Sequence, residues 1–225
     1  MVLLTDGVQT VDGDDNTAIA QASVVKSAGV ALVAIGFGGA RVATIEAMAS
    51  APASEYAYFG SDMEAIRQHF GEGAALCSLA ASPRVPPSPG LPPSAPAPPG
   101  RPPSAPLPPV TPPSPPPCEA IVDVELVLDK SGSVQSEQSS LLAFAREIVS
   151  QFTLGPSAAQ VGIVEFSNDA ATLIEMSSDL SALLAAIDNA SPAGGGTSVS
   201  DGLALGLSVI EAAADRGGPR VMVLL

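Results

Sequence analysis

The stretch Ala120-Ile-Val-Asp-Val-Glu-Leu-Val-Leu-Asp129-Lys-Ser-Gly-Ser133 decides the fold class of this chain. Its first ten residues are rich in Val, Ile and Leu and predict a buried strand. Gly132 permits a tight loop directly after that strand. The helical spacing of apolar residues over 136–152 then predicts a helix. A strand that leads through a short polar loop into a helix is the unit from which α/β proteins are built.

Strands and helices continue to alternate on both sides of this unit. Downstream, we expect strands at 160–166 and 220–225, a short edge strand at 171–176, and helices at 179–187 and 199–213. Upstream, we expect helices at 17–27, 40–50 and 62–70 and strands at 30–37 and 55–59. This alternation predicts a doubly wound α/β fold, with a mostly parallel sheet covered by helices on both faces.

A proline-rich segment, residues 81–117, separates an apolar segment at 1–80 from another at 118–225. It holds 19 of the chain's 23 prolines and cannot belong to a packed core. Its composition favours polyproline II, which rises about 3.1 Å per residue and gives 83–117 a reach of roughly 110 Å. We interpret it as a spacer, with a docking site for a proline-binding module as the alternative. Its composition resembles the hydroxyproline-rich spacers of plant and algal extracellular matrix glycoproteins.

The charge of the chain narrows the classes of partner. The formal net charge is -14 at pH 7, which disfavours binding to nucleic acid or to an anionic membrane surface. No uncharged apolar stretch reaches the length that a bilayer span requires. We therefore expect protein partners, with no nucleic acid and no membrane insertion.

Oxygen-bearing side chains gather in three predicted loops. Asp129, Ser131 and Ser133 follow the first strand at alternate positions, Thr197 precedes a helix, and Asp6 follows the apolar run Met1-Val-Leu-Leu4. Open α/β sheets place their sites at the carboxyl ends of strands. Hard oxygen ligands suit Mg²⁺, Mn²⁺ or Ca²⁺. Because only two of the five side chains are anionic, a bound ion would keep positive charge and an open position for an acidic group from a partner.

Four stretches together resemble the von Willebrand factor type A domain family: 124–133, the strand 161–167, Gly195-Gly-Thr197 and Val2-Leu-Leu-Thr-Asp6-Gly7. The resemblance implies a metal-ion-dependent adhesion site. In that site Asp129, Ser131 and Ser133 would be first-loop ligands, Thr197 the second-loop ligand and Asp6 the third-loop carboxylate. The order departs from the family, because the third-loop residue precedes the other four.

This order suggests how the chain is assembled. Residues 118–225 would supply the first half of such a domain and 1–80 the second half, joined by the spacer. Met222-Val-Leu-Leu225 also repeats Met1-Val-Leu-Leu4, which suggests a window cut from tandem repeats. We hypothesise that the chain can fold as a circular permutant, in which the two copies of Met-Val-Leu-Leu compete for one central strand position. Alternatively, each half belongs with a neighbouring repeat of the same protein.

Two cysteines, Cys77 and Cys118, flank the spacer. Neither has a histidine or second cysteine at metal-ligand spacing, so a zinc site is not expected. They could pair with each other, pair with cysteines of neighbouring repeats, or remain two buried thiols. A disulfide would imply an oxidising compartment. In the resembled family, cysteines often join the two ends of one domain, which are the positions that Cys118 and Cys77 occupy.

We expect a binding module and no enzyme. The only histidine, His69, has no evident partner, and Ser131 lies outside a Gly-x-Ser-x-Gly elbow. The expected function is divalent-cation-dependent adhesion by an extracellular matrix or cell-surface protein, with an acidic residue of the ligand completing the metal coordination. The first alternative is a structural matrix or cell-wall module with a non-functional metal site. An intracellular relative of the fold is a third, which the spacer and the cysteine placement disfavour.

Overall fold

The computed structural model describes residues 9–11, 13–37, 40–60 and 121–224. These residues form one six-stranded sheet in the order β2-β1-β6-β3-β4-β5. All neighbouring strands are parallel except β4 and β5, which are antiparallel. The strands are β1 (Ala31–Phe37), β2 (Ala57–Gly60), β3 (Val122–Asp129), β4 (Ala159–Phe166), β5 (Ala170–Ser177) and β6 (Arg220–Leu224).

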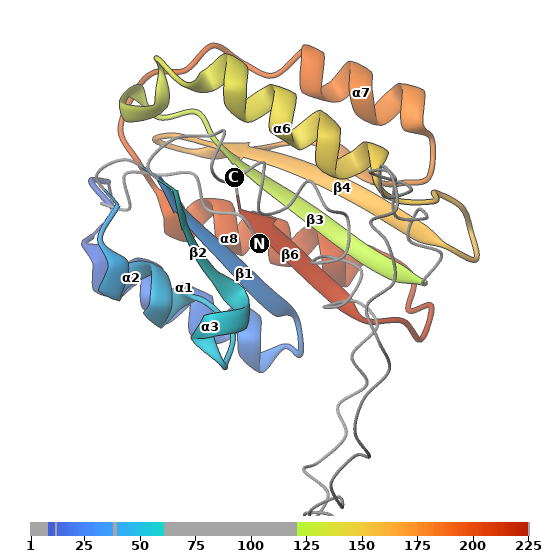
Figure 1. Cartoon of the computed structure of the whole chain (residues 1–225), viewed down its shortest axis with the longest axis horizontal. Coiled ribbons are helices and arrows are strands. Elements are labelled where there is room, and N and C mark those ends of the chain that lie inside the picture. The colour runs from blue at the N-terminus through green and yellow to red at the C-terminus, as the bar shows by residue number, and fades with distance from the viewer. Residues whose placement is uncertain (1–8, 12, 38–39, 61–120, 225) are drawn as a thin grey trace, which may run out of the picture.

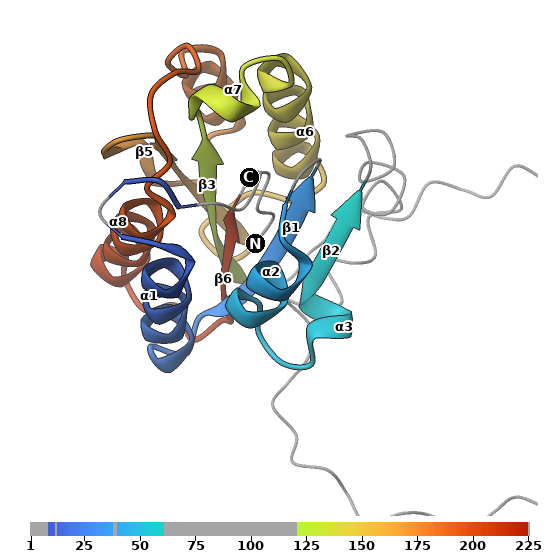
Figure 2. The ribbon, with the colours of Figure 1, turned by 90° about the vertical axis from the view of Figure 1, so that its left-hand side faces the viewer.

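Helices cover both faces of this sheet. Helices α6 and α7 lie on one face, and α8, α1 and α2 lie on the other (Figures 1 and 2). A four-residue helix, α3, leads directly into β2. The bounds are α1 (Asp15–Ser27), α2 (Val42–Met48), α3 (Ala53–Tyr56), α6 (Gln138–Ser150), α7 (Leu180–Asp188) and α8 (Val199–Ala212), with a 3-10 turn at Gly132–Val134.

The strand β3 lies in the middle of the core and is buried along its whole length. Its side chains alternate between the face of α6 and the face of α8, and both faces are closed. Close packing of α8 on β3 and β4 depends on glycine. A Cβ atom at Gly202 would come 2.6 Å from the ring of Phe166 and 3.0 Å from Val127, closer than packed carbon atoms can approach.

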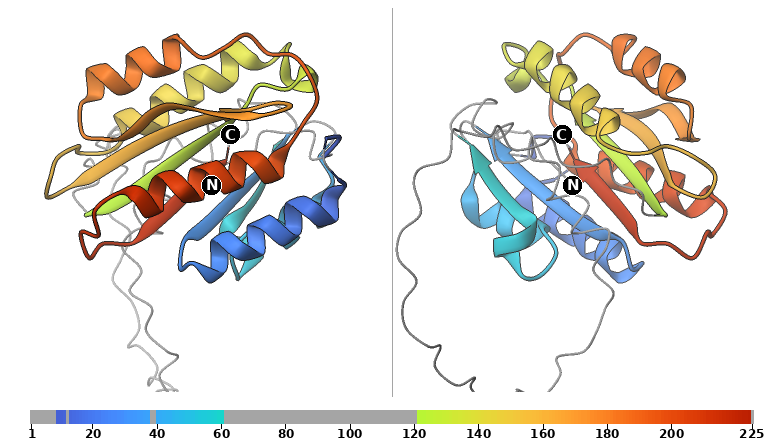
Figure 3. Two further views of the ribbon diagram at one scale, coloured as in Figure 1. Left: turned by 180° about the vertical axis from the view of Figure 1, so that it is seen from behind. Right: turned by 45° about the vertical axis from the view of Figure 1, so that its right-hand side comes forward.

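The sheet joins strands from the two ends of the chain. Strand β6 lies between β1 and β3, and its residues Val221–Leu224 are buried. Val33 of β1 is in register with Val223, and Leu126 of β3 is in register with the same residue. Helix α1 runs beside α8 across the same junction (Figure 3). The central strand position is thus occupied by the copy of Met-Val-Leu-Leu in β6, while Met1–Leu4 lies outside the described residues.

The predicted fold class is confirmed: the structure is a doubly wound α/β fold with a mostly parallel sheet. Several bounds need correction. The edge strand predicted at 171–176 is the eight-residue β5, and the helix predicted at 40–50 is the shorter α2. The strand predicted at 55–59 is wrong at its start, because Glu55 and Tyr56 belong to α3 and the strand begins at Ala57. The helix predicted at 62–70 lies outside the described residues.

Among the described residues, no helix has the length and apolar character needed to cross a bilayer.

Candidate functional site

The first loop gathers one carboxylate and two hydroxyls at the carboxyl end of β3. Asp129 is the last residue of the strand and is 1% exposed. Its Oδ1 accepts a hydrogen bond of 2.7 Å from the backbone N–H of Ser131. The hydroxyls of Ser131 and Ser133 lie 2.9 Å apart. Ser131 is fully buried and Ser133 is exposed, so the oxygens of this loop extend from the core to the surface of the protein.

The second loop, residues 190–198, is bound to the first by backbone hydrogen bonds. Gly132 N–H donates to the carbonyl of Gly195 at 3.0 Å, and Gly194 N–H donates to the carbonyl of Lys130 at 2.7 Å. A Cβ at Gly132 would lie 3.2 Å from that Gly195 oxygen, so the close approach favours glycine. Gly195 itself has φ of +85°, in the left-handed region that favours glycine. The glycines therefore bring the loop that carries Thr197 against the loop that carries Asp129.

Thr197 occupies a buried position in this second loop. It is 3% exposed and directly precedes Ser198, the N-cap of α8. Asn168, in the loop after β4, accepts a 2.6 Å hydrogen bond from Gly196 N–H through its side-chain oxygen. Ser198 N–H donates to the carbonyl of Ser167. The loop after β3, the loop after β4 and the loop before α8 are thus held together by hydrogen bonds.

Residues 9–11 also bind this second loop. Thr10 N–H donates to the carbonyl of Thr197 at 2.9 Å, and the Thr10 hydroxyl accepts from Thr197 N–H at 2.9 Å. The Gln9 side chain exchanges hydrogen bonds with the hydroxyl and backbone N–H of Ser200. The segment that follows Asp6-Gly7 is therefore held beside Thr197. Asp6 lies outside the described residues, as do Cys77 and Cys118.

The lysine inside the first loop is held by an acid. Lys130 Nζ lies 3.2 Å from Glu165 Oε1, and Glu165 is 3% exposed. The same carboxylate accepts hydrogen bonds from the N–H and hydroxyl of Ser191, at the start of the second loop. Glu165 compensates a positive charge that lies next to Asp129 in the chain. It also links the two loops through side chains.

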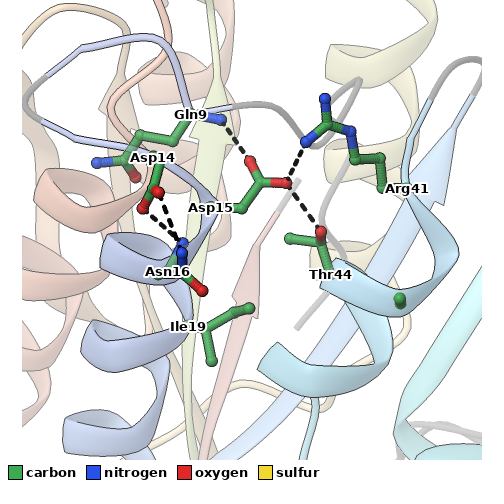
Figure 4. A pocket seen from close by; sticks show the side chains of 8 residues that line it. Gln9, Asp14, Asp15, Asn16, Ile19, Arg41 and Thr44 are labelled. Atoms are coloured by element: carbon green, nitrogen blue, oxygen red, sulfur yellow. Dashed lines mark hydrogen bonds and ion pairs between the residues drawn. The ribbon is translucent and has the colours of Figure 1, made fainter.

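A cavity of about 430 Å³, lined mainly by polar residues, opens between the first turns of α1 and α2 (Figure 4). Asp15 lies at its centre and accepts from Gln9 N–H, from the Arg41 guanidinium and from the Thr44 hydroxyl. Asp14 caps α1 by accepting a hydrogen bond from Asn16 N–H. Because Gln9 lines the cavity and also binds Ser200, the cavity adjoins the loop of Thr197.

The arrangement suits a hard divalent cation by its donor chemistry. Hydroxyl and carboxylate oxygens converge at the end of β3, and these are the ligands that Mg²⁺, Mn²⁺ and Ca²⁺ prefer. Within the described ranges, no three His, Cys, Asp or Glu side chains are close enough together to hold a metal ion.

Sequence reasoning missed three residues that shape this site. Glu165 neutralises Lys130, Asn168 holds Gly196, and Thr10 pairs with Thr197. Glu165 lies inside the strand predicted at 160–166, and Asn168 follows that strand. That position could have marked Glu165, a lone acid in an otherwise apolar strand. No local pattern marks Thr10, whose partner is 187 residues away.

The family model for the von Willebrand factor type A domain matches residues 1–72 and 123–225. The chain belongs to this family. The match covers both parts of the sheet and all five predicted metal ligands, and it leaves out the proline-rich spacer. The resemblance inferred from the four sequence stretches is therefore confirmed at the level of the family.

Comparisons with individual proteins add detail. A 113-residue stretch is 26% identical to the collagen alpha-4(VI) chain of Mus musculus, covering 48% of this chain and 5% of that protein. An uncharacterized protein from Alicyclobacillus acidocaldarius shares the fold at a TM-score of 0.56 and 13% identity, with coverage of 94% and 92%. Proximal thread matrix protein 1 from the mussel byssus was solved with a zinc-occupied MIDAS (metal-ion-dependent adhesion site) motif. It is 20% identical to this chain at a TM-score of 0.42. That match covers 99% of this chain and 49% of the mussel protein.

The chain thus spans a small fraction of the curated relative that it matches.

Proposed function

We propose that this von Willebrand factor type A domain binds other proteins through a divalent cation, as a module of an extracellular matrix or cell-surface protein. Asp129, Ser131, Ser133 and Thr197 would hold the ion, and Asp6 would bind it directly or through water. An aspartate or glutamate of the partner would complete the coordination. The observation that carries the proposal is the convergence of Asp129 and the two serine hydroxyls at the carboxyl end of β3.

The chain's own residues prepare this site in two ways. The hydrogen bond from Ser131 N–H fixes the Asp129 carboxylate against the first loop. Glu165 holds Lys130, so that the positive charge nearest to the ligands is compensated. A bound Mg²⁺ or Mn²⁺ would supply the electrostatic attraction for an acidic side chain. The adjoining cavity around Asp15 would then contact residues of the partner next to that acid.

A binding role is favoured over an enzymatic one by the groups available near Asp129. The described neighbours are serine and threonine hydroxyls, glycine backbone and the Lys130–Glu165 pair. The chain's single histidine lies outside the described residues. The structural alternative, a matrix module with a non-functional metal site, differs in predicting partner binding without metal.

Metal binding is expected to stabilise the folded chain. An ion at 100 times its dissociation constant adds about 2.7 kcal/mol, which raises the unfolding midpoint of a domain of this size by roughly 5–10 °C. We expect this gain with Mg²⁺ or Mn²⁺, and its loss with EDTA. Asp129→Ala should abolish it, and Asp6→Ala should reduce it strongly. Thermal unfolding followed by circular dichroism measures the effect.

The matched control for Asp129→Ala is Asp169→Ala, which removes an exposed carboxylate from the loop after β4, at the same carboxyl end of the strands. This variant should keep the full metal-dependent gain. A folded wild type that gains nothing from any of the three cations would contradict the proposal and favour the structural module. An equal loss in Asp169→Ala would show a general effect of surface charge.

A further inference from the structure

The junction between β1 and β6 is an interface that a second copy of the chain can supply. It joins residues 9–60 to residues 121–224, which meet in space without being adjacent in sequence. Between these two described parts, the connection consists of parallel strand pairing, packing of α1 against α8, and the hydrogen bonds of Gln9 and Thr10. No ion pair among the described residues crosses it, since each one lies within a single part.

Neither part can leave its side of this junction open to water. Leu32, Val33 and Ile35 of β1 are fully buried, and so are Met222, Val223 and Leu224 of β6. Removing residues 9–60 would turn β6 from a central strand into an edge strand with unpaired N–H and C=O groups. Exposed apolar edge strands pair readily with another chain. The part formed by residues 121–224 therefore requires a β1 partner, whichever chain provides it.

The link between the two parts favours exchange. Residues 61–120 connect them, and the composition of 83–117 predicts a stiff polyproline spacer. The effective concentration of one tethered part near the other falls as a linker grows beyond the span that it must bridge. Pairing within one chain therefore has a limited advantage over pairing between chains. Exchange of an identical element between two copies is a low-cost route to a dimer.

We propose that the chain exchanges residues 9–60 with a second copy of itself, forming domain-swapped assemblies through the β1–β6 junction. In the exchanged state, one copy supplies the loops of Asp129 and Thr197. Its partner copy supplies Gln9 and Thr10, which bind the Thr197 loop. Each candidate metal site is then built from two chains. The proposal does not depend on the metal, because the contacts that carry it are strand pairing and apolar burial.

Two proline variants test this proposal by complementation. Val33→Pro disrupts β1, and Val223→Pro disrupts β6, because proline cannot donate to the strand ladder. Neither variant alone contains both an intact β1 and an intact β6. An equimolar mixture holds an intact β6 part in one chain and an intact β1 part in the other. We expect unfolding and refolding of the mixture to give a heterodimer by native mass spectrometry and to recover a cooperative unfolding transition.

The control is a mixture of tagged and untagged Val33→Pro, which lacks any intact β1 and should give no heterodimer. A second arm uses the wild type, refolded as an equal mixture of ¹⁵N-labelled and unlabelled chains. Its mixed-mass dimer should increase with chain concentration over about two decades up to the millimolar range. All samples contain EDTA. Absence of the heterodimer in the first arm, or a wild type that stays monomeric at every concentration, would overturn the proposal.

Discussion

Replacing Arg216 by alanine is expected to lower the free energy of unfolding by about 3–5 kcal/mol, because it leaves the buried carboxylate of Asp123 without its partner. Arg216 lies in the connection between α8 and β6, with its side chain 12% exposed. Its Nε donates to Asp123 Oδ1 at 3.0 Å, and Asp123 is 2% exposed. Equilibrium unfolding in urea measures the loss.

The Arg216 guanidinium also donates hydrogen bonds to backbone carbonyl oxygens near the amino ends of β3 and β4. It donates to Val122 O at 2.8 Å, at the start of β3, and to Ala158 O at 2.7 Å, just before β4. Pro156 O accepts a further bond of 3.1 Å. These contacts tie the amino ends of β3 and β4 to the loop that enters β6. Arg216→Lys should recover part of the stability, because a lysine retains the charge but lacks the planar set of five donors.

Arg146→Ala is the matched control for Arg216→Ala. Arg146 pairs with Asp188 between α6 and α7, with side chains 38% and 53% exposed. Exposed ion pairs contribute about 0–1 kcal/mol. If the two alanine variants lose similar stability, then Arg216 is no more important than a surface charge, and the expected role of the buried pair is wrong.

Replacing the ionisable carboxyl group of Glu125 by an amide is expected to stabilise the protein at neutral pH. Glu125 lies in the middle of β3 and is 0% exposed, and neither of its carboxylate oxygens has a hydrogen-bond partner. Glycines make room for it: a Cβ at Gly162 of β4 would lie 2.2 Å from Glu125 Oε2, and one at Gly206 of α8 would lie 3.3 Å from its Cγ. Burial raises the pKa of Glu125 well above its ordinary value, and the charge of Glu175 on β5 raises it further.

This raised pKa sets the sign of the pH dependence. The folded protein keeps Glu125 protonated at pH values where the unfolded chain, with an ordinary glutamate pKa of about 4.3, releases the proton. Stability from this group is thus fully present below pH 4 and is lost as the pH rises towards the folded-state pKa, at up to about 1.4 kcal/mol per pH unit. Glu125→Gln removes this slope. Its stability relative to the wild type should increase with pH from about pH 4.5.

Urea unfolding of wild type and Glu125→Gln from pH 4 to pH 8 tests this expectation. The measured quantity is the change with pH in the difference between the unfolding free energies of the two proteins. The buried glutamine amide lowers the stability of the variant equally at every pH, so it does not affect this change. Glu175→Gln, which changes an exposed acid, serves as the control and should alter the slope only slightly. A constant difference between wild type and Glu125→Gln at all pH values would contradict a raised pKa.

The two buried acids show where sequence reasoning reaches its limit in this fold. In β3, Asp123 and Glu125 alternate with apolar residues, a pattern typical of a strand with one face in water. The structure instead covers that face with α8 and its neighbours, so both acids are buried. Pattern alone identified the strand and its bounds to within two residues. It could not reveal Arg216, which lies 93 residues from Asp123 and meets it only after the sheet has formed.

The candidate site divides in the same way. The ligands of the first loop follow one another in sequence, and their convergence at the end of β3 could be predicted from spacing. The contacts that position Thr197 come from Gly132, Asn168 and Thr10, which belong to three separate segments. The short helix α3 was missed because its four residues, Ala53–Tyr56, are too few for an apolar period to appear.

The parallel pairing of β1 with β6 has a mechanical consequence for exchanged copies. The connection formed by residues 61–120, which includes the spacer, leaves one part after Gly60, the carboxyl end of β2, and enters the other before Val122, the amino end of β3. Because β2, β1, β6 and β3 are parallel, these two attachment points lie at opposite ends of the strands. Tension along a row of exchanged chains therefore pulls the junction in shear, which loads all its hydrogen bonds at once. A joint loaded in this way resists stretching far better than one that opens bond by bond.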